Sequence, residues 1–334
     1  MKRYNNHKKL SFSKARQSGF TLVELLLAST LGLFVVGGVI TSFIGTKDSE
    51  QMRAAVSEMD SNARTAIEVL RRSISIAGYA GMNAIPGFDK PFYSAVDELD
   101  PFTRGSTNRS CGGGVTMHTA GMAPGSNQYT RDSNNVTGRG DVLTAVYLAD
   151  NPCKAGETSC TDSSKVNPKA MIYTDCTGGG ATRDAQAVRC STDKSVGMTE
   201  SIQAKLYSTF YLGSGSDAEK RTLYCQGNRG GAQPLAENIE YLQFLYGVKT
   251  SSGAVEYMKA DDVEGATPKL WENVISVRVG LLIRSSNKNL LKKPSTKERY
   301  ILLDRSVEVS DLQRLYKVYT TTINLPNRTY RGIL

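Results

Sequence analysis

The stretch KARQSGFTLVELLLASTLGLFVVGGVITSFIG, residues 14–45, decides how this chain is built. A basic segment leads into Gly19, and from Phe20 to Ile44 the chain is apolar over a length that can cross a membrane as a helix. One charged residue, Glu24, interrupts the apolar run. A carboxylate inside a bilayer costs about 2.5–3.5 kcal/mol on insertion scales. Glu24 therefore needs either a charged partner or a route to water.

Basic residues are concentrated at the N-terminus of the chain. Residues 1–19 contain no acidic residue but six of the 41 Lys and Arg, namely Lys2, Arg3, Lys8, Lys9, Lys14 and Arg16. Without these six, the net charge falls from +9 to +3, so no basic stripe remains to bind a nucleic acid. Basic residues beside a hydrophobic span stay in the cytoplasm, which predicts that the C-terminal side crosses the membrane.

Three kinds of N-terminal segment can be compared with this one. A secretory signal peptide has an apolar region of about 7–15 residues and an A-x-A-like cleavage site. Here the apolar run covers residues 20–44 and no such site follows it. A plain membrane anchor needs about 20 apolar residues, and an early Glu only adds cost to it. The third kind of N-terminal segment is one whose function requires both the Gly19-Phe20 junction and Glu24.

Residues 18–25, Ser-Gly-Phe-Thr-Leu-Val-Glu-Leu, resemble the class III leader of type IV prepilins and type II secretion pseudopilins. The resemblance implies that a membrane-embedded prepilin peptidase cleaves after Gly19 and methylates the new amine of Phe20. It also implies that Glu24 meets the Phe20 amine of a neighbouring subunit during filament assembly. A buried charge is tolerated when it is paired, so such a salt bridge would account for Glu24. A Glu24 that reaches the membrane surface from the first helical turn is the alternative.

Apolar residues continue at helical spacing beyond the span. They form one stripe with steps of three or four residues: Met52, Val56, Met59, Ala63, Ile67, Leu70, Ile74 and Ala77. The pattern predicts a helix from Phe20 to about Ala77 that ends at Gly78 or Gly81, with a transmembrane half (20–45) and an amphipathic half (46–80). Three glycines weaken the first half. These glycines are Gly32, Gly37 and Gly38. They favour close packing between helices or, as the resemblance implies for filaments of that family, local melting of the helix.

Alternating segments rich in β-branched residues predict strands after this helix, at 141–148, 201–213, 221–225, 274–285, 299–303 and 315–325. In residues 274–285, one face collects Ile275, Val277, Val279, Leu281 and Ile283. Residues 236–250 fit either a helix or a strand. A long helix followed by strands predicts an α+β fold, in which residues 81–334 form a globular domain whose antiparallel sheet packs on the helix's second half.

Six cysteines follow the span: Cys111, Cys153, Cys160, Cys176, Cys190 and Cys225. An even number in an exported chain predicts disulfides, although six cysteines allow 15 pairings. Proximity in sequence favours Cys153–Cys160 and Cys176–Cys190. A zinc site is disfavoured because the chain has no C-x-x-C pair and only two histidines. Five of the six cysteines lie in or beside two long Gly- and Ser-rich insertions, at about 82–135 and 150–200.

Four later segments resemble a narrower group, the PilW-type minor pilins, which are similar to the type II secretion pseudopilin GspJ. These segments are RGDVLTAVYL, LAENIEYLQFLYGV, WENVISVRVGLLIRS and YTTTINLPNR. The resemblance implies a pilin-like fold and a minor pilin that helps initiate pilus assembly near the tip. Implied partners are other minor pilins, the major pilin, a PilY-family tip protein and prepilin peptidase.

Such a protein would span the inner membrane once, with a periplasmic domain, before it joins a pilus used in twitching motility or cell adhesion. Two alternatives remain open at this point. One is a GspJ-like pseudopilin at the tip of a type II secretion pseudopilus. The other is a membrane-anchored extracytoplasmic receptor or enzyme.

The sequence predicts no catalytic residue, cofactor or metal site. His118 lies in a Gly-rich loop, and no G-x-x-x-x-G-K-S/T phosphate loop is present. There are two acidic clusters, one formed by Asp97, Glu98 and Asp100 and the other by Asp261, Asp262 and Glu264. Their carboxylates are ligands that suit calcium. Neither cluster follows the D-x-D-x-D-G pattern, so solvated turns are the simpler interpretation. Trp271, the single tryptophan, is predicted to lie in the core. We therefore expect a structural protein rather than an enzyme.

Overall fold

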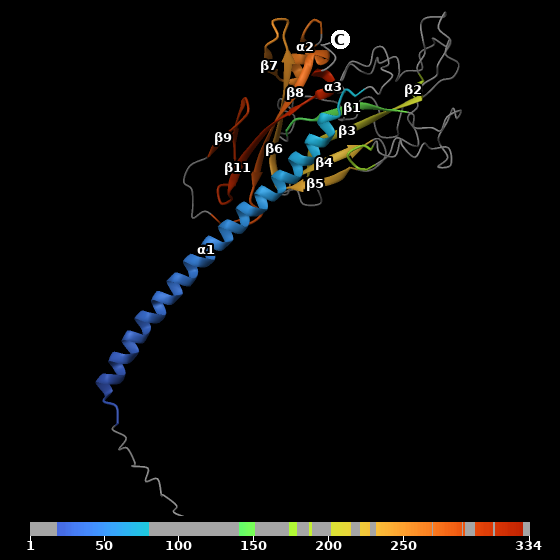
Figure 1. The fold of residues 1–334 in the computed structure, drawn as a ribbon. Coiled ribbons are helices and arrows are strands. Elements are labelled where there is room, and N and C mark those ends of the chain that lie inside the picture. The colour runs from blue at the N-terminus through green and yellow to red at the C-terminus, as the bar shows by residue number, and fades with distance from the viewer. Residues whose placement is uncertain are drawn as a thin grey trace, which may run out of the picture. The chain divides into compact units, whose positions relative to one another are not determined.

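The computed structural model describes residues 19–79, 140–150, 174–178, 187–188, 202–214, 221–227, 232–268, 270–288, 290, 298–309 and 311–329. The chain divides into two compact units, residues 1–53 and 54–334. Helix α1 (Leu22–Ser75) begins in the first unit and ends in the second (Figure 1). Each unit is described by itself.

The described part of the first unit is an exposed apolar helix. Every residue from Gly19 to Arg53 is exposed, including Phe20 at 83% and Phe34 at 81%. By length and composition, α1 is able to cross a membrane, and none of its most apolar window is buried within the chain. A helix that is apolar on all sides requires an apolar environment outside its own chain.

The second unit contains two larger antiparallel sheets and a two-stranded one. The first has the order β1 (Leu143–Asp150), β3 (Ile202–Ser214), β4 (Arg221–Gly227) and β5 (Gln233–Glu237), with β2 (Ala187–Val188) also paired to β3. The second has the order β11 (Tyr316–Asn324), β8 (Val274–Arg284), β6 (Ile239–Lys249) and β7 (Val255–Met258). The chain passes from one sheet to the other at Asn238, which has a φ of 62°. These elements confirm the predicted α+β fold.

Five shorter elements belong to the described part of the second unit. Strands β9 (Arg299–Leu302) and β10 (Arg305–Glu308) form a hairpin. Its residues Leu302 and Val307 pack with Leu282 on the face of the second sheet that is turned away from α1. The helical elements are α2 (Ala260–Gly265), the 3-10 turn η5 (Trp271–Asn273) and α3 (Pro326–Thr329).

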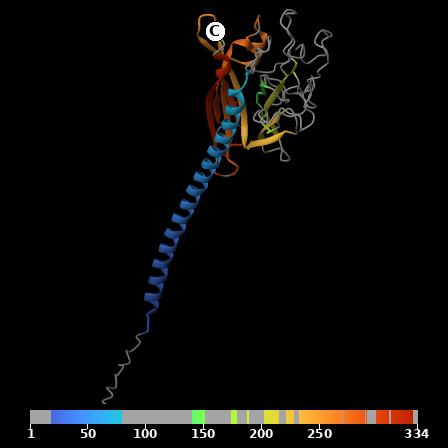
Figure 2. The ribbon, with the colours of Figure 1, turned by 45° about the vertical axis from the view of Figure 1, so that its right-hand side comes forward.

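The core lies between the C-terminal half of α1 and the two sheets (Figure 1). Figure 2 shows strands of both sheets alongside this half of the helix. The predicted stripe is confirmed at its C-terminal end and shifted at its start: the buried residues are Ala55, Met59, Ala63, Ala66, Leu70, Ile74 and Ala77. Met52 is 41% exposed, while Val56 and Ile67 are half-buried. Four of these seven buried residues are alanines, whose small side chains let the helix backbone approach the sheets closely.

The helix ends as the sequence predicts. Gly78 follows the last turn with a φ of 73°, a conformation that glycine adopts without strain. Its N–H donates to the carbonyl oxygen of Val146 in β1 at 2.8 Å. The end of the helix is therefore fixed to the edge of the first sheet. Gly81 lies outside the described residues.

The ambiguous segment 236–250 forms β5 and β6 rather than a helix. The core-facing side of β8 is confirmed for Val277, Val279, Leu281 and Ile283, but Ile275 is half-buried and Val274 takes its place in the core. The reason is a shift in register between β6 and β8, where consecutive β6 residues pair with Ser276 and Val274. The residue between them is the extra residue of a β-bulge, which breaks the alternation of faces.

Candidate assembly site

Helix α1 begins at Leu22 because Thr21 caps it. The backbone N–H of Glu24 donates to Thr21 Oγ1 at 3.2 Å. A Thr at the N-cap with a Glu three residues later is the capping-box pattern, in which the hydroxyl satisfies a backbone donor that the first turn leaves unpaired. The expectations from the sequence do not include this cap, although the Thr-x-x-Glu spacing encodes it.

The cap leaves the predicted cleavage junction outside the helix. Gly19 and Phe20 precede the first turn and are exposed, as is Glu24. An exposed peptide bond in non-helical backbone is open to a peptidase. Glu24 lies in the first turn of α1, where the helix dipole favours a negative charge.

Polar side chains of the apolar helix bond to their own backbone. Thr41 Oγ1 donates to the carbonyl oxygens of Gly37 at 2.8 Å and Gly38 at 3.0 Å. Thr30 Oγ1 bonds to the Leu27 carbonyl at 2.9 Å. Such internal bonds let hydroxyl groups enter an apolar environment without losing a partner. The helix runs unbroken through the predicted weak glycines, and a methyl group added at Gly32, Gly37 or Gly38 would meet no atom within 4 Å.

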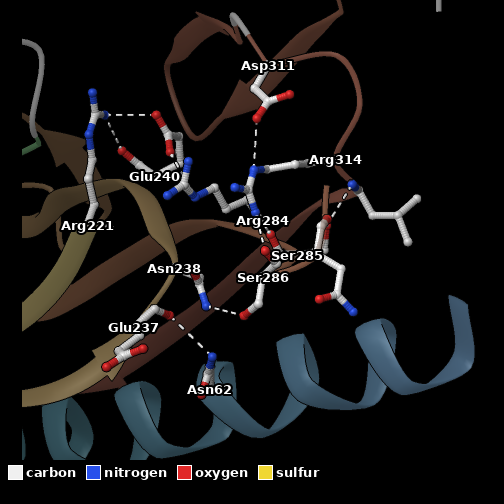
Figure 3. A network of polar contacts seen from close by, with 12 residues as sticks. Asn62, Arg221, Glu237, Asn238, Glu240, Arg284, Ser285, Ser286, Asp311 and Arg314 are labelled. Atoms are coloured by element: carbon white, nitrogen blue, oxygen red, sulfur yellow. Dashed lines mark hydrogen bonds and ion pairs between the residues drawn. The ribbon is translucent and has the colours of Figure 1, made fainter. Parts of the chain in front are cut away.

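A network of polar contacts fixes the C-terminal half of α1 to the junction of the two sheets (Figure 3). Asn62 Nδ2 donates to the Glu237 carbonyl oxygen at 3.3 Å. Asn238 Nδ2 donates to Ser286 Oγ at 2.6 Å, and this hydroxyl in turn bonds to Glu58 of the helix. Asparagine tolerates the left-handed backbone that the junction requires. The same short segment therefore turns the chain between sheets and holds the helix.

Charged groups extend this network across the sheets (Figure 3). Arg221 Nη1 of β4 donates to the Glu240 carbonyl at 2.8 Å and lies 3.1 Å from Glu240 Oε1. Arg284 Nε of β8 lies 3.7 Å from Glu240 Oε2. One carboxylate of β6 thus joins a strand of the first sheet to a strand of the second. Paired charges at this depth fix which strands are neighbours.

Arg314 holds the segment before β11 in the same way. Its Nε donates to Asp311 Oδ2 at 2.8 Å, and its Nη1 donates to the Ser285 carbonyl at 2.7 Å. Partial burial opposes ionisation of Asp311, but hydrogen bonds from Arg314 and from the Gln313 N–H outweigh it, so the pKa of Asp311 is lowered.

Asp60 ties the helix to β11. Lys317 Nζ lies 2.8 Å from Asp60 Oδ1, and the Tyr319 hydroxyl donates to the same oxygen. These hydrogen bonds, that from Lys317 first, lower the pKa of Asp60. Burial and the neighbouring Asp60 raise the pKa of Tyr319. No local pattern in the sequence predicts this contact, because the partners lie about 260 residues apart in the chain.

Residues 209–327, from β3 to α3, match the family model of the Type IV Pilus-assembly protein W, PilW. Residues 14–40 match the prokaryotic N-terminal methylation motif. These matches indicate a PilW-type minor pilin of a type IV pilus. The first match contains the second sheet and the second contains the start of α1. Together they imply interaction of this minor pilin with other pilins and with the prepilin peptidase.

Solved structures also resemble this chain. A type IV-like pilin from Thermus thermophilus is 13% identical in sequence, with a TM-score of 0.27, over 58% of this chain and 81% of that chain. No curated protein matches the minor pilin.

The minor pilin contains a disulfide that differs from the predicted pairing. Cys176 is bonded to Cys225, not to Cys190, with 6.2 Å between the two Cα atoms. Residues 174–178 are held against the first sheet, where the Cys176 N–H donates to Ser208 Oγ at 3.0 Å. The prediction based on proximity in sequence is wrong because the fold places Cys225, which is buried in β4, next to Cys176. The remaining cysteines, Cys111, Cys153, Cys160 and Cys190, lie outside the described residues.

Within the described part of the minor pilin, no three His, Cys, Asp or Glu side chains gather as a metal site would require. Glu264 of the second acidic cluster accepts a hydrogen bond from Trp271 Nε1 at 2.6 Å. Trp271 is 1% exposed, which confirms its predicted place in the core, and its ring meets Tyr246 edge to face. His118 and the cluster at Asp97 lie outside the described residues.

Proposed function

We propose that this minor pilin is made as a prepilin, cleaved between Gly19 and Phe20, methylated at Phe20, and then built into a pilus whose assembly it helps to initiate. The observation that carries the proposal is the capped helix start. Thr21 Oγ1 accepts the Glu24 N–H, and the exposed Gly19–Phe20 junction precedes an apolar helix that its own chain leaves uncovered. The methylation-motif match over residues 14–40 supports the same assignment.

Glu24 pairs with the Phe20 amine of a neighbouring subunit in this proposal. The carboxylate is exposed on an otherwise apolar surface, and taking it into a membrane or a filament core unpaired would be costly. A newly formed amine on a neighbour supplies the opposite charge. A pair of this kind contributes more to register between subunits than to stability.

The proposal divides the chain by function into four parts. Residues 1–19 are the removed leader, 20–45 the membrane-spanning half of the helix, 46–80 its amphipathic half and 81–334 the globular domain. The basic leader keeps the N-terminus in the cytoplasm, so the globular domain is periplasmic before assembly. Burial of the helix inside the chain begins at Ala55, which agrees with a helix that leaves the membrane before that point.

We assign this minor pilin to the tip region, with other minor pilins, the major pilin and a PilY-family tip protein as neighbours. The support is the match to a pilus-assembly family rather than to a filament-forming major subunit. The role is structural and needs no catalytic group. No observation favours the pseudopilin alternative.

The direct test is to locate the protein in pili. The full chain carrying a C-terminal epitope tag would be produced in its own host, and pili would be sheared and labelled with gold-conjugated antibody. The proposal expects label near one end of the filaments, and a large loss of pili in a strain that lacks the gene. Label absent from every filament, or pili unchanged in number without the gene, would overturn it.

A further inference from the structure

The edges of the two sheets are protected unequally. An edge strand presents unpaired N–H and C=O groups that bind other strands unless the protein blocks them. At β1, the Gly78 N–H occupies the Val146 carbonyl. The edge at β5 is interrupted by Pro234, by a register shift against β4, and by the hydrogen bond from Asn62 to the Glu237 carbonyl oxygen. The edge strand β7 is only four residues long. Three of the four edges therefore carry a recognised form of protection.

Strand β11, the fourth edge, carries none of these devices. Its nine residues pair with β8 without a register shift, and the strand contains no Pro or Gly. Its single charged residue, Lys317, is engaged with Asp60. A long, regular and mostly uncharged edge is the kind that accepts another strand.

The hydrogen bonds at the two ends of β11 show which backbone groups point outward. The Ser285 N–H donates to the Leu315 carbonyl, and the Leu325 N–H donates to the Ile275 carbonyl, each at 2.8 Å. Because bonded and outward-facing residues alternate in an antiparallel pair, the odd-numbered residues of β11 face β8. The outward groups belong to the even-numbered residues, namely Tyr316, Val318, Thr320, Thr322 and Asn324.

The side chains along the C-terminal part of this edge are the more exposed ones. Tyr316 and Val318 pack against the β9–β10 hairpin cluster, whereas Thr320, Thr322 and Asn324 are exposed. In the part of the chain that the structure describes, the outward backbone groups of these three residues make no hydrogen bond. We call these groups of Thr320, Thr322 and Asn324 the free edge.

We propose that the free edge binds an extended strand of a different pilin of the same pilus, which adds to the second sheet beside β11. The proposal rests on the proposed function, which brings this chain into contact with other pilins. Alternating backbone donors and acceptors recognise an extended polypeptide rather than a lipid or a small molecule. The flanking side chains are small and uncharged, so a partner strand buries no charge when it pairs.

Proline at position 322 tests the free edge without breaking the sheet. Thr322→Pro removes an outward N–H and leaves every bond to β8 in place, which is the position where an edge strand tolerates Pro. Thr322→Val is the matched control, because it keeps the N–H. Thr321→Pro removes an N–H that faces β8, so it is the control for a variant that loses a hydrogen bond within the sheet. Each full-length variant would be quantified in sheared pili, and its melting temperature measured in detergent.

Loss of one hydrogen bond at a subunit contact predicts about 10-fold less Thr322→Pro protein in pili, with Thr322→Val near wild type. Thr322→Pro should melt near the wild-type temperature and Thr321→Pro well below it. Incorporation of Thr322→Pro at the wild-type level would overturn the proposal. A detergent-solubilised homodimer that Thr322→Pro abolishes would also overturn it, because a second copy would then occupy the edge.

Amide hydrogen exchange on the wild-type chain decides the case if Thr322→Pro fails to fold. The Thr320 and Thr322 amides should exchange rapidly in the solubilised subunit and at least 10-fold more slowly in pili, while Thr321 and Ile323 stay protected in both. Equally rapid exchange of Thr320 and Thr322 in pili would refute strand addition. Absence of the wild-type protein from pili is a different result, because it removes the proposed function itself.

Discussion

The two halves of helix α1 differ in where their apolar side chains are buried. From Leu22 to Arg53 the helix is exposed, and as far as Ile44 it is apolar on all sides apart from Glu24. From Ala55 onward one stripe is buried against the sheets, and charged residues occupy the opposite face. One continuous helix therefore meets two kinds of surroundings. The first half depends on a membrane or on neighbouring subunits, and the second half depends on its own chain.

The largest effect in the first half is expected at Glu24. Glu24→Ala should leave membrane insertion and the melting temperature of the subunit unchanged but strongly reduce its incorporation into pili. The reason is that removal of one partner from a buried ion pair typically costs about 3–5 kcal/mol. Quantitative immunoblots of sheared pili measure the effect, with Glu24→Asp as the control that keeps the charge. Normal incorporation of Glu24→Ala would refute the pairing.

In the second half, Leu70 provides the strongest contrast. Leu70 is fully buried in the core, so Leu70→Ala should lower the free energy of unfolding by about 2–5 kcal/mol. Leu31, which is 59% exposed in the first half, is the matched control. Urea unfolding of the detergent-solubilised chain, followed by Trp271 fluorescence, measures both. Equal destabilisation by the two substitutions would contradict the division of the helix.

The disulfide sharpens the comparison inside the second unit. Cys176 and Cys225 are 49 residues apart in sequence, and closing a loop of this size typically stabilises a protein by about 2–4 kcal/mol. Cys225→Ser should therefore lower the free energy of unfolding by that amount, and reductant should have less effect on the variant than on the wild type. Peptide mapping that finds Cys176 joined to Cys190 would contradict the structure.

The smallest effect is expected from Asp60 and depends on pH. Because its folded pKa lies below the ordinary value of 3.8, Asp60 stabilises the fold above that value and loses this contribution as the pH falls through the folded pKa. Asp60→Asn should reduce the loss of stability below about pH 4. Melting temperatures of both proteins from pH 2 to 6 measure it. Identical pH profiles would show that the contact with Lys317 contributes little.

The sequence predicts the helix, its two halves and most strands, because each depends on a local pattern. It does not distinguish helix from strand in residues 236–250, since β6 is buried on both faces from Leu242 to Val248 and loses its alternation. The sequence also does not predict the pairing of Cys176 with Cys225 or the contact of Asp60 with β11. Both depend on which distant strands become neighbours, and periodicity carries no such information. The Thr21 cap is different, because a local spacing encodes it and it was overlooked.

The N-terminus of the mature protein tests the central claim most directly. The chain would be recovered from sheared pili and its N-terminal peptide identified by mass spectrometry. Our account predicts a peptide that begins with N-methylated Phe20 and lacks residues 1–19. Retention of residues 1–19, or cleavage beyond Ile44, would contradict it, because the apolar half of α1 would then be a permanent anchor or would be absent from the filament.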